Sequence, residues 1–144
     1  MLKKNGVKMN FLFVCVHNSG RSQMAEAFFN NKIGKSKHFA NSAGTEPTSH
    51  VNLNVIEAMK EKGIDISKSI PKLLTYDMIQ SDTKVITMGC SVDKSKCPVL
   101  PQGIEDWNLD DPNDKSYDDV KIIRDQVEKN VLNVIKNLNS EDTI

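Results

Sequence analysis

The sequence predicts an α/β fold: a three-layer α/β/α domain around a four-stranded parallel sheet, with residues 1–144 as one domain. Short apolar segments alternate with segments of helical periodicity, the order expected for parallel strands joined by crossover helices. The first apolar run, Phe11–Val16, is nearly continuous, as is typical of a central parallel strand buried on both faces. With 144 residues, the chain is long enough to bury one substantial core.

After this strand, we expect a helix over Ser22–Ile33, with the Ser22 hydroxyl capping its first turn and Gly34 ending it. His38–Ala43 has the pattern of a weaker strand that stops at Gly44. Four apolar residues at helical spacing predict a second helix that stops near Lys62 and Gly63: Val51, Val55, Ile56 and Met59.

The second half of the chain continues the alternation. A short helix is expected around Thr75–Ile79, a third buried strand over Lys84–Met88 and a fourth strand near Ile104–Leu109. The last helix has the clearest pattern, because its apolar residues recur at steps of three and four. These residues are Val120, Ile123, Val127, Val131, Val134 and Leu138.

Composition limits the setting of the protein. Nineteen basic and nineteen acidic residues cancel, so no global field favours nucleic acid or an anionic membrane surface. The apolar stretch Val7–Val16 is too short and too interrupted for a signal peptide or a membrane span. Three cysteines without an export signal point to a reducing cytoplasm, in which thiols are catalytic or redox-active.

The most informative segment is residues 15–22, Cys-Val-His-Asn-Ser-Gly-Arg-Ser, directly after the first strand. A strand, a small-residue loop and a helix N-terminus turn backbone N–H groups toward one point and bind a tetrahedral oxyanion. Arg21 adds a charged fork, and the same field stabilises a nucleophilic thiolate at Cys15. The residues expected to line this oxyanion site are Val16, His17, Asn18, Ser19, Gly20, Arg21 and Ser22.

Plainer roles are open to these residues. Cys15 as a small buried hydrophobe and Arg21 as a surface ion pair are both disfavoured by their fixed spacing within the loop. Asn18 either shapes the loop through hydrogen bonds to the backbone or is a simple turn residue. We expect His17 to be a loop residue without a role in proton transfer.

Several ordered motifs carry a resemblance to a known family. The cysteine loop, the segment Ser42–Thr45 and the late Asp-Asp-Pro resemble the low-molecular-weight protein tyrosine phosphatase superfamily. From about Met9 to Leu138, the chain is most similar to the thioredoxin-coupled arsenate reductases in that superfamily. The motifs that carry this closer likeness are Arg21–Glu26, Ser42–Pro47, Ile64–Ser67, Cys90-x6-Cys97-Pro98 and Trp107-x2-Asp110-Asp111-Pro112.

The resemblance implies a reaction. Cys15 attacks arsenate held by the loop and Arg21, and Cys90 then attacks Cys15, so that arsenite leaves and a disulfide forms. Cys97 opens that disulfide, and an external dithiol such as thioredoxin or glutaredoxin reduces the final Cys90–Cys97 bond. No bound cofactor is expected. Phosphate should bind without being reduced, since phosphorus(V) does not accept the two electrons.

The resemblance also implies a general acid immediately before proline, which assigns that role to Asp111 rather than Asp110. A carboxylic acid there protonates the departing oxygen, which is a poor leaving group without its proton. A turn or N-cap role for Asp111 is the alternative. The family pattern further implies a hydrogen bond from Ser22 to the Cys15 thiolate. We expect Trp107 to anchor the packing of this loop rather than to touch substrate.

The sequence gives little support for either of two possible metal sites, one for zinc and one for potassium. Zinc ligation by Cys15, His17, Cys90 and Cys97 lacks any pair at Cys-x2-4-Cys spacing. Some relatives bind potassium through an asparagine, a glutamate, a serine, and a later threonine and aspartate. Here Asn18, Glu26 and Ser42 are present, but the later pair falls near Ile70 and Lys72. That site is therefore expected to be missing or replaced by the lysine charge, and no metal is expected to be required.

The sequence is also compatible with other functions. Cys90 and Cys97 are either redox thiols or incidental cysteines, and they separate a reductase from a phosphatase, which needs only Cys15. A phosphotyrosine or other phosphomonoester phosphatase is the main rival, and a non-catalytic oxyanion sensor is a rival of a different class. We expect a monomer that binds neither nucleic acid nor membrane.

Overall fold

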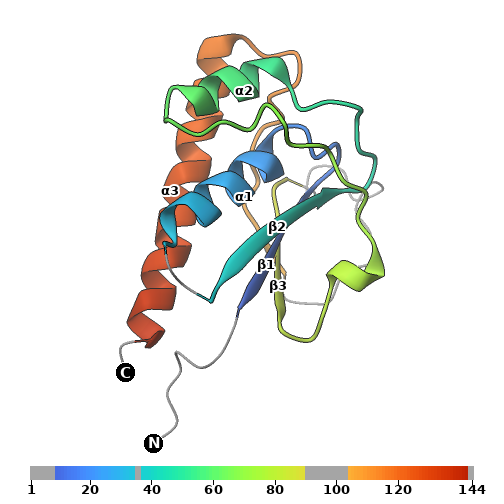
Figure 1. Ribbon diagram of the computed structural model, residues 1–144. Coiled ribbons are helices and arrows are strands. Elements are labelled where there is room, and N and C mark those ends of the chain that lie inside the picture. Colours follow the sequence, from blue (N-terminus) through green and yellow to red (C-terminus); the bar gives the residue numbers. More distant parts are fainter. Residues whose placement is uncertain (1–8, 35–36, 90–103, 143–144) are drawn as a thin grey trace, which may run out of the picture.

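A computed structural model describes residues 9–34, 37–89 and 104–142. Within them, one sheet has the strand order β2-β1-β3-β4 and every pairing is parallel. Its strands are β1 (Asn10–Cys15), β2 (Phe39–Gly44), β3 (Thr83–Thr87) and β4 (Glu105–Asp106) (Figure 1). The predicted four-stranded parallel sheet is therefore confirmed.

Three helices lie on one face of this sheet: α1 (Arg21–Lys32), α2 (Leu53–Lys60) and α3 (Tyr117–Asp142) (Figure 1). Side chains of β1 that point to this side, including Phe11 and Phe13, pack into the main core with buried residues of all three helices. Leu12 and Val14 point to the other side, into a smaller cluster with Leu74, Met78 and Ile79. The short 3-10 helix η2 (Tyr76–Met78) belongs to that second covering layer.

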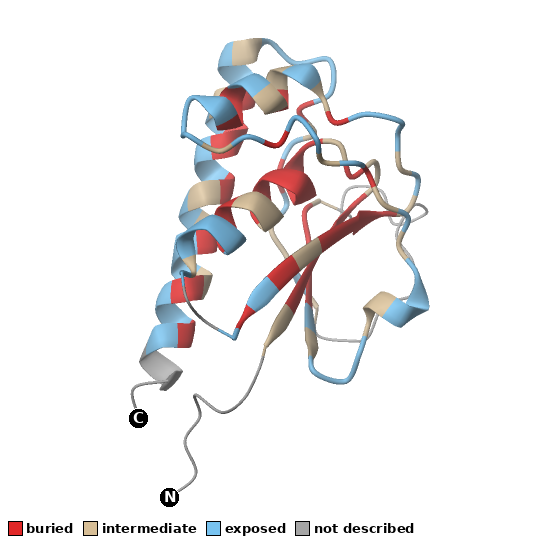
Figure 2. Cartoon of the chain, viewed as in Figure 1, coloured by how far each residue is buried: buried red, intermediate tan, exposed pale blue. Residues whose placement is uncertain are grey.

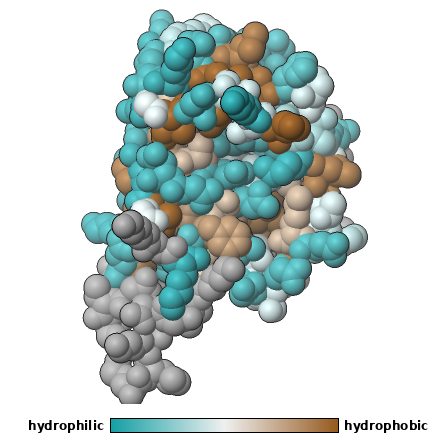
Figure 3. Space-filling model, viewed as in Figure 1, coloured by the Kyte–Doolittle hydropathy of each residue, from teal (hydrophilic) through white to brown (hydrophobic). Residues whose placement is uncertain are grey.

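Burial follows these layers. Most of β1, the carboxyl ends of β2 and β3, and the helix faces turned toward the sheet are buried, and the outer helix faces are exposed (Figure 2). The space-filling view shows a largely hydrophilic surface with separate apolar patches (Figure 3). Among the helices of the described residues, none is long and apolar enough to cross a membrane.

The register places the ends of three strands at one edge of the sheet. Cys15 pairs with Gly44 in β2, and Val14 pairs with Thr87 in β3. Beyond β3, the Met88 N–H donates to Val14 O at 2.9 Å. The loops that follow β1, β2 and β3 therefore meet at the carboxyl edge, where ligands bind in open parallel sheets.

One predicted helix start is wrong. The helix begins at Arg21, and Gly20, at its N-cap position, makes no side-chain capping hydrogen bond. Ser22 lies inside the first turn, and its hydroxyl contacts Cys15 instead of capping the backbone. The second helix is also shorter than its apolar spacing predicts. It starts at Leu53, after Asn52 Oδ1 accepts the capping hydrogen bond.

Candidate active site

Cys15 ends β1, and its side chain is buried at the carboxyl edge of the sheet. Its sulfur accepts a hydrogen bond of 3.2 Å from the Asn18 backbone N–H and lies 2.8 Å from Ser22 Oγ. Asn18 has a φ of 50°, in the left-handed region, which asparagine tolerates better than most residues. This conformation brings the Asn18 N–H back to the sulfur.

The orientation of the buried Asn18 amide, behind the serine and the sulfur, follows from its hydrogen-bond partners. Its Oδ1 accepts hydrogen bonds from the Lys72 backbone N–H at 2.8 Å and from Gln23 Nε2 at 3.0 Å. A backbone N–H can only donate, so this contact fixes which amide atom is the oxygen. The amide nitrogen then donates to Ser22 Oγ at 2.7 Å and to Ser42 Oγ at 3.0 Å.

Ser22 Oγ accepts a hydrogen bond from Asn18, and when Cys15 is a thiolate the serine hydrogen donates to the sulfur, which then has no hydrogen of its own. Ser42 likewise donates to Glu26 Oε1 at 2.5 Å, and Lys72 Nζ lies 3.3 Å from the same carboxylate oxygen. The sulfur therefore has two hydrogen-bond donors when it is a thiolate, the Asn18 N–H and the Ser22 hydroxyl.

The family resemblance raised the possibility of a potassium site, and the position of the Lys72 ammonium decides whether the described residues fit one. Lys72 Nζ lies 3.3 Å from Glu26 Oε1. This carboxylate is the last member of a hydrogen-bond network that runs from Asn18 through Ser42 to Glu26. Since a lysine already supplies the positive charge at this carboxylate, the residues present do not fit a potassium ion.

The backbone of the loop is arranged for an anion. The Val16 carbonyl accepts from the Glu46 N–H at 2.7 Å, and the Ser19 carbonyl accepts from the Asn52 N–H at 2.8 Å. Within the described part of the chain, the N–H groups of Ser19 and Gly20 have no protein acceptor. With the N-terminus of α1 beside them, they form a surface of donors suited to an oxyanion.

Arg21 is held by residues of the late loop that includes Leu109 and Asp111. Its side chain is buried, and Nη1 donates to the Leu109 carbonyl at 3.0 Å. Nη2 lies 3.8 Å from Asp111 Oδ2. The guanidinium carries five N–H donors, so these contacts leave others for a bound oxyanion.

The late loop carries Asp111 onto the anion loop. A Cβ atom on Gly20 would lie only 2.5 Å from Pro112 Cγ, so the two loops pack closely because residue 20 has no side chain. Asp111 is half-exposed beside Arg21, whereas Asp110 is exposed and has no ion pair in the described residues. Asp111 Oδ1 also accepts from the Asn113 N–H at 2.9 Å, so a turn role accompanies its position at the site.

Two further predicted residues can be placed. His17 Nδ1 lies 3.1 Å from the Glu46 carbonyl, in an exposed contact. Trp107 packs on Phe13 with ring centroids 5.5 Å apart, and its Nε1 donates to Glu105 Oε2 at 2.6 Å. Trp107 therefore contacts the core and β4 rather than the anion loop.

Cys90 and Cys97 lie outside the described residues, so their contribution to the site stays a prediction. Sequence reasoning missed Gln23 and the backbone of Lys72 as the groups that orient Asn18. No short-range signal identifies either one. Lys72 is 54 residues from Asn18 and reaches it only through the fold.

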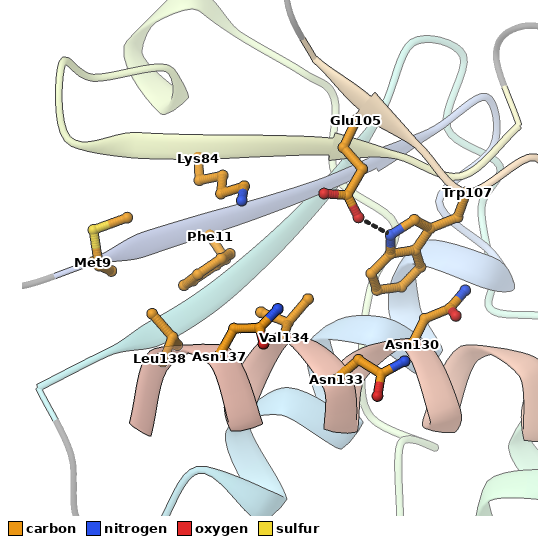
Figure 4. Close-up of a pocket in the computed structure, with 10 residues that line it drawn as sticks. All are labelled: Met9, Phe11, Lys84, Glu105, Trp107, Asn130, Asn133, Val134, Asn137 and Leu138. Atoms are coloured by element: carbon orange, nitrogen blue, oxygen red, sulfur yellow. Dashed lines mark hydrogen bonds between the residues drawn. The ribbon is translucent and has the colours of Figure 1, made fainter. Parts of the chain in front are cut away.

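A separate pocket of about 330 Å³ lies between α3 and the β3–β4 side of the sheet. It shares no residue with the anion loop (Figure 4). Carboxamides from α3, the Trp107 indole and the Glu105 carboxylate line it (Figure 4). This pocket is therefore separate from the residues around Cys15.

Comparison with known proteins agrees with this geometry. Residues 10–143 match the family model described as low molecular weight phosphotyrosine protein phosphatase. A relative from Staphylococcus epidermidis, named arsenate reductase 1, is 41% identical over 83% of this chain and 90% of its own length.

Solved structures show the same fold. A thioredoxin-dependent arsenate reductase from Corynebacterium glutamicum superposes with a TM-score of 0.73 at 36% identity, covering 91% of this chain and 62% of that one. A low molecular weight protein tyrosine phosphatase from T. tengcongensis superposes with a TM-score of 0.78 at 25% identity, covering 90% of this chain and 99% of that one.

Proposed function

The chain belongs to the low molecular weight phosphotyrosine protein phosphatase family, and from this premise we propose that it is an arsenate reductase with thioredoxin as its electron donor. The observation that carries the proposal is the environment of Cys15. Its sulfur has two hydrogen-bond donors beside a buried arginine, in a chain with two further cysteines. Reductases named for arsenate share 36–41% of their residues with it.

Arsenate is the substrate, and its oxygens are bound by the loop N–H groups and by Arg21. The Cys15 thiolate attacks arsenic, a sulfur–arsenic bond forms, and one arsenic–oxygen bond breaks. Asp111, held 3.8 Å from Arg21, gives its proton to the departing oxygen, which leaves as water. The Arg21 cation and the loop N–H groups stabilise the negative charge on the remaining oxygens.

Reduction follows when Cys90 attacks the sulfur of Cys15. A sulfur–sulfur bond forms, the sulfur–arsenic bond breaks, and its electron pair stays on arsenic, which leaves as arsenite. Arsenic gains two electrons and the two thiols lose them. Cys97 then attacks Cys90, releases the Cys15 thiolate and leaves a Cys90–Cys97 disulfide.

An external dithiol closes the cycle. The C. glutamicum relative is described as thioredoxin-dependent, which supports thioredoxin as the donor. A compartment that keeps thiols reduced is required for repeated turnover, and we place the protein in the cytoplasm on that ground.

The experiment is steady-state arsenite production from arsenate, with thioredoxin and its reductase or a glutaredoxin system supplied separately. We expect turnover that depends on the thioredoxin system and inhibition by phosphate. Hydrolysis of an aryl phosphate at a comparable rate without any reductant, and no arsenite, would make the protein a phosphatase. Oxyanion binding without either reaction would make it a sensor.

A further inference from the structure

Gly89 lies directly against the guanidinium of Arg21. A Cβ atom built on Gly89 would lie 2.5 Å from Arg21 Nη1 and 2.8 Å from the Leu109 carbonyl oxygen. These two atoms are the donor and the acceptor of the 3.0 Å hydrogen bond that holds the arginine. A single methyl group at residue 89 therefore meets both partners of that bond.

Other contacts restrict the movement of both the Leu109 carbonyl and the Arg21 guanidinium. The Leu109 backbone is fixed from its other side, since its N–H donates to the Met88 carbonyl at 2.8 Å. Arg21 is 7% exposed, and its second nitrogen lies beside Asp111. Because buried groups are closely packed, an added methyl group must push the guanidinium away from the Leu109 carbonyl.

We propose that Gly89 is a positioning residue for oxyanion binding, because its missing side chain fixes where the Arg21 guanidinium lies. With Nη1 held by the Leu109 carbonyl, the guanidinium and its remaining N–H donors keep one orientation. Such preorganisation strengthens binding because the arginine does not have to be ordered when the anion arrives. This proposal rests on the proposed function for the identity of the oxyanion, but it concerns binding and not reduction.

The test is the affinity for inorganic phosphate, measured by calorimetry on the full chain without arsenate or an electron donor. We expect Gly89→Ala to weaken phosphate binding about tenfold or more, as loss of an oriented charge-assisted contact does. Gly63→Ala is the matched control. It has a φ of 77° and no atom within 4 Å of the added Cβ, so it strains the backbone away from the site. This control should lower thermal stability and keep the phosphate affinity of the parent.

A second readout separates positioning from general damage. Nitrogen-15 NMR of the Arg21 side chain should show Nη1 hydrogens protected from solvent exchange in the parent and in Gly63→Ala. Gly89→Ala should lose that protection. Phosphate affinity within about twofold of the parent would overturn the proposal. Weaker binding with an unchanged Arg21 signal would overturn it as well.

The experiments distinguish failure of the role proposed for Gly89 from failure of the proposed reductase activity. Absence of phosphate binding in the parent protein would refute the oxyanion site together with the role of Gly89. Intact phosphate binding that Gly89→Ala weakens, in a protein that produces no arsenite, would refute the reductase and leave the role of Gly89 in place.

Discussion

The hydroxyl of Ser22 lies 2.8 Å from the sulfur of Cys15 and is the donor in this contact whenever the sulfur is a thiolate. Asn18 donates to the Ser22 oxygen, which leaves the serine hydrogen available for the sulfur. The serine hydroxyl thus contacts the sulfur rather than capping the first turn of α1.

Removal of this donor should make Cys15 less reactive. In the parent, we expect iodoacetamide to alkylate Cys15, because the thiolate is the reacting form of a cysteine. Ser22→Ala should slow alkylation at pH 6.5 about tenfold, since one hydrogen bond to a charged group is lost. Ser49→Ala, at an exposed serine, is the control. Equal rates in all three proteins would remove Ser22 from the account.

Asp111→Asn should lower arsenate turnover about a hundredfold or more, because the amide has no acidic proton to give to the leaving oxygen. Phosphate affinity should change little. Asp110→Asn is the matched control at the neighbouring exposed carboxylate and should keep nearly full activity. If the loss of turnover occurs in Asp110→Asn instead, the acid has been misassigned.

Lys72→Met should leave the Glu26 carboxylate without its cation, 3.3 Å away in the parent. We expect potassium chloride to raise the melting temperature of this variant more than choline chloride at equal ionic strength. The parent and Lys115→Met, an exposed lysine change, should show no difference between the two salts. No selective response of Lys72→Met would show that the ammonium does not act as an internal cation.

A surface contact between α2 and α3 gives a pH-dependent prediction. The Tyr117 hydroxyl donates to Glu61, which lowers the pKa of Glu61 and raises the pKa of Tyr117 to about 12. A lowered carboxyl pKa adds stability above the unfolded-state value, and this stability is lost as pH falls through the folded value. Tyr117→Phe should therefore have a lower urea midpoint than the parent at pH 7, and the gap should shrink below about pH 4.

Local sequence patterns predicted much of this fold. The apolar run of β1 and the spacing of α3 require only neighbouring residues to be recognised, and both elements are present. The strand expected near Ile104–Leu109 pairs only at Glu105–Asp106, because pairing depends on a distant partner in β3. The strand propensity of residues 104–109 carries no information about that partner.

The site divides in the same way. The loop from Cys15 to Arg21 is contiguous, so its composition and spacing alone indicate an oxyanion site. Ser22 does not cap the helix as expected, but its contact with Cys15, which the family resemblance implied, is present. The family pattern related Lys72 to the expected cation site, but its backbone contact with Asn18 and the approach of Gly89 to Arg21 arise only through packing.

The central claim is that arsenate is reduced by thiols of this chain, starting at Cys15. Cys97→Ser, mixed with arsenate and no external thiol, should release about one arsenite per molecule and stop with Cys15 joined to Cys90. Cys90→Ser should not complete even this turnover at a normal rate. Quenched single-turnover arsenite measurement with disulfide mapping by mass spectrometry tests both. A Cys15–Cys97 disulfide as the first product of the unmutated protein would reverse the order of attack, and no arsenite from that protein would contradict the reduction itself.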